Sequence, residues 1–143
     1  MTLTSPAQGL VSELRDQGFK ITSPRNRVIE SVASRDDNFT AEELAAELAS
    51  IGRATVYRTL KILLDQGLVC RVVLSDGAVC YRVSHKAHHH HLVCVSCGAT
   101  EDVDFADVED VLGRVREATD YDVVGHRLEV YGFCPRCKSL QAV

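Results

Sequence analysis

The residues with the clearest chemistry lie in the segment 85–97, HKAHHHHLVCVSC, which holds five histidines and two cysteines. A second CxxC pair stands near the end of the chain in the sequence CPRC. Two residues between the cysteines of each pair allow both sulfurs to turn toward one metal ion. The two pairs together predict a structural zinc site with the ligands Cys94, Cys97, Cys134 and Cys137.

Four successive histidines, residues 88–91, precede the first CxxC pair and are expected to lie on a strand. Neighbouring side chains of a strand point to opposite faces, so His88 and His90 should face one way and His89 and His91 the other. One strand could therefore supply two imidazoles to each of two further metal sites. A purification tag is the alternative, but an internal run that leads directly into an apolar segment and a CxxC does not fit a tag.

Length and composition are those of an ordinary globular protein. With 143 residues, 45% of them hydrophobic, the chain can form one domain or two small ones. No apolar run approaches the roughly 20 residues that cross a bilayer, so we expect no membrane partner and a cytoplasmic location. Six cysteines could form disulfides, but their metal-ligand spacing without an export signal favours zinc thiolates.

Charge is distributed unevenly along the chain, whose net charge is -4. Residues 1–83 carry ten basic and ten acidic side chains, whereas residues 84–143 carry six and ten. An acidic half beside a neutral half with local basic clusters is compatible with a DNA-binding domain joined to a metal-binding or dimerising domain.

The first half of the chain predicts a winged helix-turn-helix domain. Apolar residues at helical spacing indicate four helices, within residues 6–18, 24–33, 40–48 and 53–67. Two β-branched strands, residues 68–74 and 78–83, flank Ser75-Asp76-Gly77, which is typical of a hairpin. A basic helix directly before a hairpin indicates that the hairpin is the wing, so we assign residues 1–83 to this domain.

The fourth helix has an apolar stripe on one side and basic or aromatic residues on the other. A solvated basic face is the alternative, but its place before a wing favours DNA. We expect Tyr57 and Arg58 to contact the groove and Arg53 and Lys61 to lie nearer phosphates. Arg25, at the start of the second helix, could add a phosphate contact.

The second half predicts a small α/β domain, residues 88–143, beyond a hinge at residues 84–87. Its expected elements are two strands, a helix and a longer final strand, at residues 88–95, 99–103, 107–119 and 121–133. A free strand edge in such a unit is suited to pairing with a second copy.

Four motifs together resemble the ferric uptake regulator (Fur) superfamily, and most of all its zinc uptake regulator branch. They are ATVYRTL in the fourth helix, GLV before the hairpin, HHHHLVCVSCG and the terminal CPRC. The resemblance implies an α+β fold with an N-terminal winged helix and a C-terminal α/β dimerisation domain. It also implies a metal-responsive homodimeric repressor, not an enzyme, that binds palindromic double-stranded operator DNA and controls metal uptake genes.

The same resemblance implies a regulatory metal site at the hinge, with the ligands Cys70, His85, His89 and His91. Cys80 is an alternative to His85. Because a thiolate suits zinc better than iron or manganese, zinc is the expected metal. As an alternative, Cys70 and Cys80 could be small buried hydrophobic residues, a reading that fits Cys80 better than Cys70.

Several positions depart from the patterns of the superfamily. Asn38 and Arg82 stand where iron sensors carry a histidine and a glutamate. Ser84 and Cys70 stand where zinc sensors often carry a cysteine and an aspartate. Compared with zinc sensors, the chain lacks the cysteine near Ser84 but has one at Cys70, so one thiolate is kept near the hinge. The complete ligand set stays open.

A third site is implied by the resemblance, with the ligands His88, His90, Glu109 and His126. Judged alone, His126 fits a core histidine better than a ligand. Two other functions compete with zinc-dependent repression. Iron or peroxide sensing belongs to the same superfamily, whereas a zinc hydrolase is a remote alternative, because it needs an open metal position and the chain has no HExxH.

Overall fold

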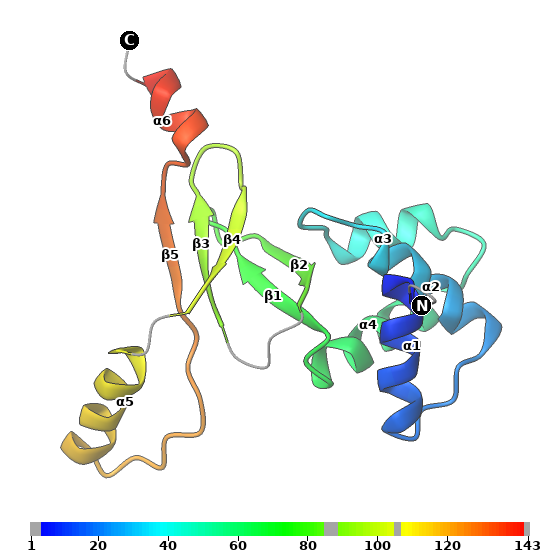
Figure 1. Cartoon of the computed structure of the whole chain (residues 1–143), viewed down its shortest axis with the longest axis horizontal. Coiled ribbons are helices and arrows are strands. Elements are labelled where there is room, and N and C mark those ends of the chain that lie inside the picture. Colours follow the sequence, from blue (N-terminus) through cyan, green and yellow to red (C-terminus); the bar gives the residue numbers. More distant parts are fainter. Residues whose placement is uncertain (1–3, 85–88, 105–106, 142–143) are drawn as a thin grey trace. The chain divides into compact units, whose positions relative to one another are not determined.

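The computed structural model describes residues 4–84, 89–104 and 107–141. The chain divides into two compact units, Met1–Ala87 and His88–Val143, here called the N-terminal and C-terminal units. Of the predicted hinge, Ser84 is described and buried, whereas residues 85–87 lie outside the described residues. Figure 1 shows the elements of each unit.

The N-terminal unit contains the predicted helices and hairpin. They are α1 Pro6–Asp16, α2 Ser23–Ala33, α3 Ala41–Glu47, α4 Arg53–Asp65, β1 Val69–Val73 and β2 Val79–Val83. Hydroxyl side chains begin the first three helices: Ser5, Thr22 and Thr40 each accept a hydrogen bond from a backbone N–H in the first turn. Each of these caps satisfies a donor that the helix itself cannot pair.

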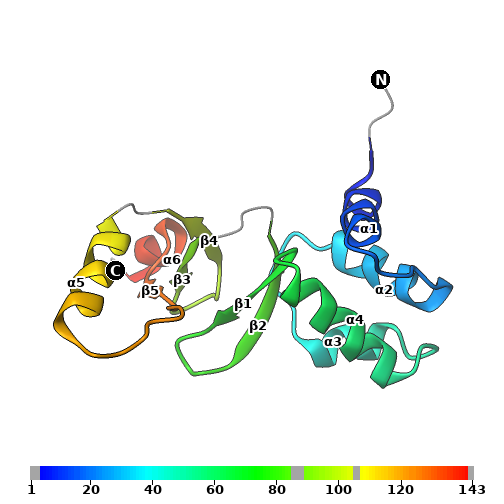
Figure 2. The same cartoon turned by 90° about the horizontal axis from the view of Figure 1, so that it is seen from below.

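Aliphatic side chains from all four helices fill the core of this unit. Leu14, Val28, Leu44 and Leu63 are fully buried. Figure 2 shows α3 beside α4, with the hairpin following the end of α4. Because the apolar stripe of α4 is used in the core, its other face is left toward solvent.

The hairpin is tied to the helices by an aromatic pair. Phe39 and Tyr81 exchange two backbone hydrogen bonds, of 2.9 and 2.7 Å, and their ring centroids lie 6.1 Å apart. The two strands are antiparallel, with Cys70 opposite Arg82 and Cys80 opposite Val72. Gly77, with φ of 87°, provides the left-handed residue that the connecting turn needs. The winged helix-turn-helix fold is therefore confirmed.

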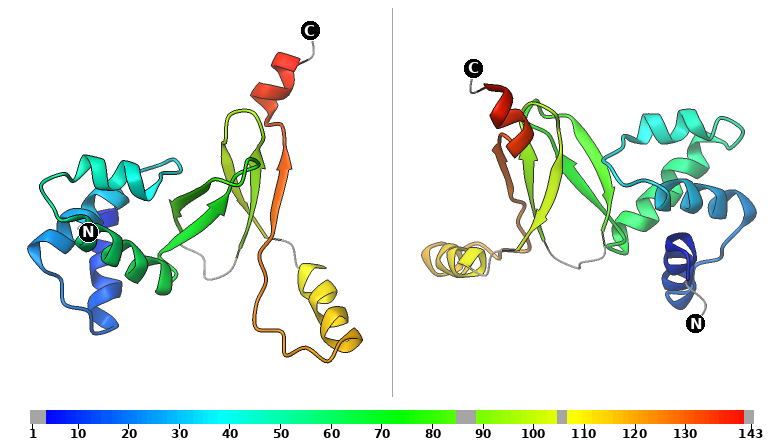
Figure 3. Two further views of the ribbon diagram at one scale, coloured as in Figure 1. Left: turned by 180° about the vertical axis from the view of Figure 1, so that it is seen from behind. Right: turned by 45° about the horizontal axis from the view of Figure 1, so that its top comes forward.

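A three-stranded sheet forms the centre of the C-terminal unit. Its strands are β3 His90–Cys94, β4 Thr100–Val103 and β5 Glu129–Gly132, in the order β4-β3-β5. β3 is antiparallel to β4 and parallel to β5. Two helices complete the unit, α5 Asp107–Ala118 and α6 Pro135–Gln141. Figure 3 shows both helices beyond the ends of the strands.

The final strand is shorter than predicted. We expected a strand over residues 121–133, but only Glu129–Gly132 pairs with β3, which is itself five residues long. Toward the start of β5, the pairing with β3 ends at the hydrogen bond that the N–H of His91 donates to the carbonyl oxygen of Leu128, at 3.3 Å. Alternating apolar residues before that point have no neighbouring strand within the described part of the chain, so periodicity alone overestimated the strand. Helix α6, which follows β5, was not predicted.

The apolar residues of α5 at helical spacing, Val108, Val111, Leu112 and Val115, are predicted to pack inward, but Val111 and Val115 are exposed and the other two are half-buried. None of the described residues of α5 is buried; Val111 is 57% and Val115 is 42% exposed. Tyr121 and Val124, in the following segment, are 82% and 95% exposed. An apolar surface of this kind is typical of an interaction site.

Candidate functional site

The four cysteines of the two CxxC pairs come together at one end of the sheet. Cys94 is the last residue of β3, and the parallel strand β5 leads to Cys134 at the same end. Gly98, with φ of 78°, closes the turn that holds Cys97, and α6 carries Cys137. The four sulfurs lie within 4.8 Å of one another, with Cys97 Sγ and Cys134 Sγ 3.8 Å apart.

This sulfur arrangement fits a tetrahedral zinc ion. A Zn–S bond of about 2.3 Å places the corners of a tetrahedron about 3.8 Å apart, which is the distance between Cys97 Sγ and Cys134 Sγ. All six cysteines of the chain are described, and none forms a disulfide. The donor chemistry and the spacing therefore suit a metal with thiolate ligands.

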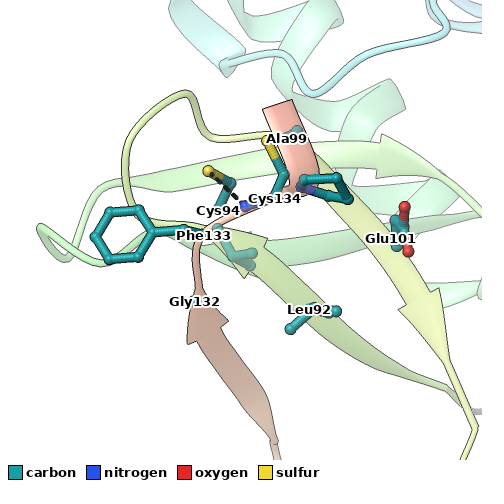
Figure 4. Close-up of a pocket in the computed structure, with 9 residues that line it drawn as sticks. Leu92, Cys94, Ala99, Glu101, Gly132, Phe133 and Cys134 are labelled. Atoms are coloured by element: carbon teal, nitrogen blue, oxygen red, sulfur yellow. Dashed lines mark hydrogen bonds between the residues drawn. The ribbon is translucent and has the colours of Figure 1, made fainter. Parts of the chain in front are cut away.

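Backbone N–H groups lower the pKa of two of the four cysteine thiols, Cys94 and Cys97. The N–H of Cys134 donates to Cys94 Sγ at 3.4 Å, as Figure 4 shows, and it is the main reason that the pKa of Cys94 falls to about 6. The backbone N–H of Ala99 lowers the pKa of Cys97. The neighbouring sulfur of Cys134 raises the pKa of Cys137 to about 11. A bound dication would favour the thiolate form of every member.

A small pocket borders this cysteine cluster, lined in part by Leu92, Phe133 and Pro135 (Figure 4). Its volume is about 120 Å³, and Glu101 is the one carboxylate among its lining residues. Pockets for small molecules are usually about 300–1,000 Å³. The pocket therefore resembles an apolar depression more than a substrate site.

The histidines of β3 alternate between its faces. The rings of His89 and His91 lie 4.9 Å apart, whereas the ring of His90 lies 5.1 Å from that of His126. His90 and His91 are both buried. His88, predicted to join His90, lies outside the described residues. Two separate imidazole pairs therefore form, His89 with His91 and His90 with His126.

Two carboxylates that sequence reasoning missed lie beside the His89–His91 pair. Asp102 Oδ1 is 3.7 Å from His89 Nε2 and 3.9 Å from His91 Nε2. Glu129 Oε1 is 4.0 Å from His91 Nδ1. Both acids stand opposite His91 in the sheet, Asp102 on β4 and Glu129 on β5. The tight turn at Gly98 could have predicted Asp102, because it fixes which β4 residue faces His91.

The other predicted ligands of the regulatory site belong to the N-terminal unit. Cys70, on β1, has its sulfur 3.6 Å from the carbonyl oxygen of Arg82. Cys80, on β2, is buried, and burial is the main reason that its thiol pKa is raised. A raised pKa opposes the thiolate form of Cys80 in the absence of a metal. His85 lies outside the described residues.

The remaining members of the predicted third site occupy two different segments. Glu109 is exposed in the first turn of α5. His126 lies before β5, in a segment without strand pairing, and not on the predicted long strand. Its proximity to His90 therefore depends on the loop that precedes β5.

The predicted DNA-contacting residues of α4 lie on its solvent side. Arg53, Tyr57, Arg58 and Lys61 are exposed. Arg58 Nη2 lies 3.4 Å from Thr55 Oγ1, and Lys61 Nζ pairs with Asp65 at 2.8 Å. Both are exposed local contacts, which phosphate or base atoms can replace at small cost.

Arg25 is the exception among the predicted contacts. Its Nη1 donates to the carbonyl oxygen of Lys20 at 2.6 Å, and its Nε is buried. This arrangement holds the guanidinium against the segment that precedes α2. Arg25 therefore contributes to local structure whether or not it also contacts a phosphate.

Comparison with known proteins identifies the family. The sequence profile of the Ferric uptake regulator family matches residues 16–131. The chain is 35% identical over 131 residues to the ferric uptake regulation protein of Legionella pneumophila, covering 88% of this chain and 96% of that protein. The protein belongs to the ferric uptake regulator family. It is also 31% identical over 133 residues to the peroxide-responsive repressor PerR of Staphylococcus epidermidis, covering 90% of this chain and 87% of that one.

Among solved structures, a zinc uptake regulator complexed with zinc and DNA is similar over 100% of both chains. The TM-score is 0.80 and the sequence identity is 22%, so this likeness shows the fold alone. Members of the ferric uptake regulator family are metal-responsive transcription regulators, and the α+β fold with a winged helix agrees with that assignment. None of the helices in the described ranges is long and apolar enough to cross a membrane.

Proposed function

We propose that this member of the ferric uptake regulator family is a zinc-responsive repressor. In this proposal a homodimer binds palindromic operator DNA when loaded with zinc and represses metal uptake genes. The observation that supports it most is the His89–His91 pair beside Asp102, on the same strand that leads to the four-cysteine cluster. Zinc accepts imidazole and carboxylate donors, and the thiolate of Cys70 is the predicted ligand that favours zinc over iron or manganese.

The regulatory zinc would take its ligands from both units. His89 and His91 come from the C-terminal unit, whereas Cys70 and His85 come from the N-terminal unit. The carboxylate of Asp102 extends this set, either as a ligand or as an acceptor for an imidazole N–H. Zinc bound in this way favours one arrangement of the two units, because it binds only the arrangement that brings its ligands together.

The four-cysteine cluster would hold a second, permanent zinc. Four thiolates complete a tetrahedral coordination shell, so this ion has a structural role. The histidines His88, His90 and His126 would hold a third ion together with Glu109. The 5.1 Å between the rings of His90 and His126 supports this assignment.

Dimerisation would use the exposed apolar surface of the C-terminal unit. The face of α5 with Val111 and Val115 is open, and β5 has only β3 as its neighbour in the described sheet. A symmetric dimer presents two copies of α4, and a two-fold axis matches a palindromic operator.

Replacing Arg58 and Lys61 by alanine should separate two kinds of DNA contact. Arg58→Ala should weaken operator binding by about 1–3 kcal/mol and relax the sequence preference, because a base contact is lost. Lys61→Ala should weaken binding to all sequences alike. The slope of log affinity against log salt should become shallower by about 0.9, the value for one lost phosphate contact. Binding isotherms on the duplex selected from a random pool, and on its scrambled version, measure both effects. Equal behaviour of the two variants would contradict these roles.

Iron or peroxide sensing is the second candidate, and two observations favour it. The named relatives at 35% and 31% identity are a ferric uptake regulation protein and a peroxide-responsive repressor. Asp102 also adds an oxygen donor of the kind that iron and manganese prefer. Loading the protein with zinc, iron(II) or manganese(II) and comparing DNA affinity tests the choice. Tightest binding with zinc supports our proposal, and tightest binding with iron supports the alternative.

The zinc hydrolase is the weaker alternative. A catalytic zinc needs an open position for water, whereas four sulfurs fill a tetrahedral site. The neighbouring pocket, of about 120 Å³, is small for a substrate.

A further inference from the structure

Three side chains form a closed cluster at the start of α4, which we call the Glu42 cluster: Glu42 of α3, with Arg53 and Tyr57 of α4. Arg53 Nη2 lies 2.9 Å from Glu42 Oε2 and 3.1 Å from Oε1. The hydroxyl of Tyr57 donates a short hydrogen bond to Glu42 Oε1. The guanidinium of Arg53 lies 5.7 Å from the ring centroid of Tyr57. One carboxylate thus engages two residues that α4 presents toward solvent.

The protonation states follow from these contacts. The hydrogen bond from Tyr57, followed by the pairing with Arg53, lowers the pKa of Glu42. The bond to Glu42 raises the pKa of Tyr57, and Glu42 raises the pKa of Arg53. At neutral pH the cluster therefore holds one carboxylate, one guanidinium and one neutral hydroxyl. The cluster therefore has a net charge of zero, because the Glu42 carboxylate neutralises the guanidinium of Arg53 that α4 would present to DNA.

We infer that Glu42 reduces sequence-independent DNA binding by competing with phosphates for Arg53. This inference rests on the proposed function, in which α4 binds DNA. A phosphate that approaches Arg53 has to displace the Glu42 carboxylate and is repelled by it. Sequence-independent binding depends almost entirely on phosphate contacts, so this competition weakens it most. Arg58, whose nearest partner is Thr55, is outside the cluster and stays available for base contacts.

Glu42 has little role in folding. The side chains of Arg53 and Glu42 are 64% and 69% exposed, and exposed ion pairs contribute little to stability. A neutral replacement should therefore leave the fold intact. Any change in DNA binding can then be assigned to the surface charge.

Glu42→Gln tests the inference on a random-sequence duplex, with the zinc-loaded full-length protein, between about 50 and 200 mM salt. The variant should bind this duplex about fivefold to tenfold more tightly at the lower salt concentrations. Its slope of log affinity against log salt should be steeper by about 0.9, the value for one additional phosphate contact. The operator-to-random affinity ratio should fall.

Glu43→Gln is the matched control, because it makes the same charge change one residue later on α3. Glu43 accepts a hydrogen bond from the backbone N–H of Thr40 through its side-chain oxygen, and glutamine keeps an oxygen for that bond. This variant should keep the salt slope of the wild type. In an Arg53→Gln background, Glu42→Gln should have no further effect on the slope.

Three outcomes would overturn the inference. The first is an unchanged slope in Glu42→Gln while the wild type binds DNA, which leaves the proposed function standing. The second is an equal change in Glu42→Gln and Glu43→Gln, since a general charge effect would then be sufficient. The third is a wild-type protein that binds no duplex with or without zinc, which contradicts the proposed function as well.

Discussion

Cys94→Ser is expected to remove one zinc ion per chain and to unfold the C-terminal unit. Among the described residues of that unit, the buried hydrophobic side chains are Val93 and two of the clustered cysteines, Cys94 and Cys137. Such a small core depends on its metal, and a structural zinc site contributes about 10–16 kcal/mol of binding free energy in small zinc-binding peptides. Zinc content and hydrogen exchange of the amides of residues 89–141 measure the two effects.

Cys80→Ser is the control for that experiment. It replaces a buried cysteine of the N-terminal unit and should leave the four-cysteine zinc and the exchange rates of the C-terminal unit unchanged. A Cys94→Ser protein with full zinc content and wild-type protection would contradict the structural role of the cluster.

Cys70→Ser and His91→Ala are each expected to abolish the effect of zinc on DNA binding without removing the structural zinc. Zinc should tighten operator binding by the wild type by about 5- to 150-fold, corresponding to about 1–3 kcal/mol of coupling. Loss of a thiolate or an imidazole removes the preference of zinc for the arrangement in which its ligands meet. Metal content per chain should fall by one ion, and the zinc dependence of affinity should disappear.

Comparing the two wing cysteines, Cys70 and Cys80, shows which residues complete the regulatory site. If His85 completes the site with Cys70, Cys80→Ser keeps the zinc response. If Cys80 takes the place of His85, as the sequence left open, Cys70→Ser and Cys80→Ser both lose the response. A zinc response that survives Cys70→Ser, Cys80→Ser and His91→Ala alike would show that the regulatory site is elsewhere.

The sequence predicted the N-terminal unit in detail because its signals are local. Thr40 and Glu43 form a capping box that begins α3, and Asp76 and Gly77 form the turn of the hairpin. The apolar stripe of α4 needs only the helical period to be recognised. Such signals depend on neighbours a few residues away, so they do not require knowledge of the tertiary structure.

The C-terminal unit was predicted less completely because its contacts are long-range. The four-cysteine cluster was predicted because CxxC spacing carries its own geometry. Asp102 and Glu129 were missed, since the register of β4 and β5 against β3 brings them to His91, and only that of β4 is fixed by a local signal, the turn at Gly98. The apolar residues of α5 and of the segment with Tyr121 suggested packing and pairing within one chain, whereas the described unit leaves them exposed.

The most direct test of the central claim is the affinity of the wild-type protein for its selected operator duplex, with and without regulatory zinc. A chelator that spares the four-cysteine site removes only the exchangeable ion, so the fold is kept in both states. We predict that zinc tightens binding by about 5- to 150-fold and that chelation reverses the change. Equal affinity in the two states, with the structural zinc present in both, would contradict zinc-dependent repression.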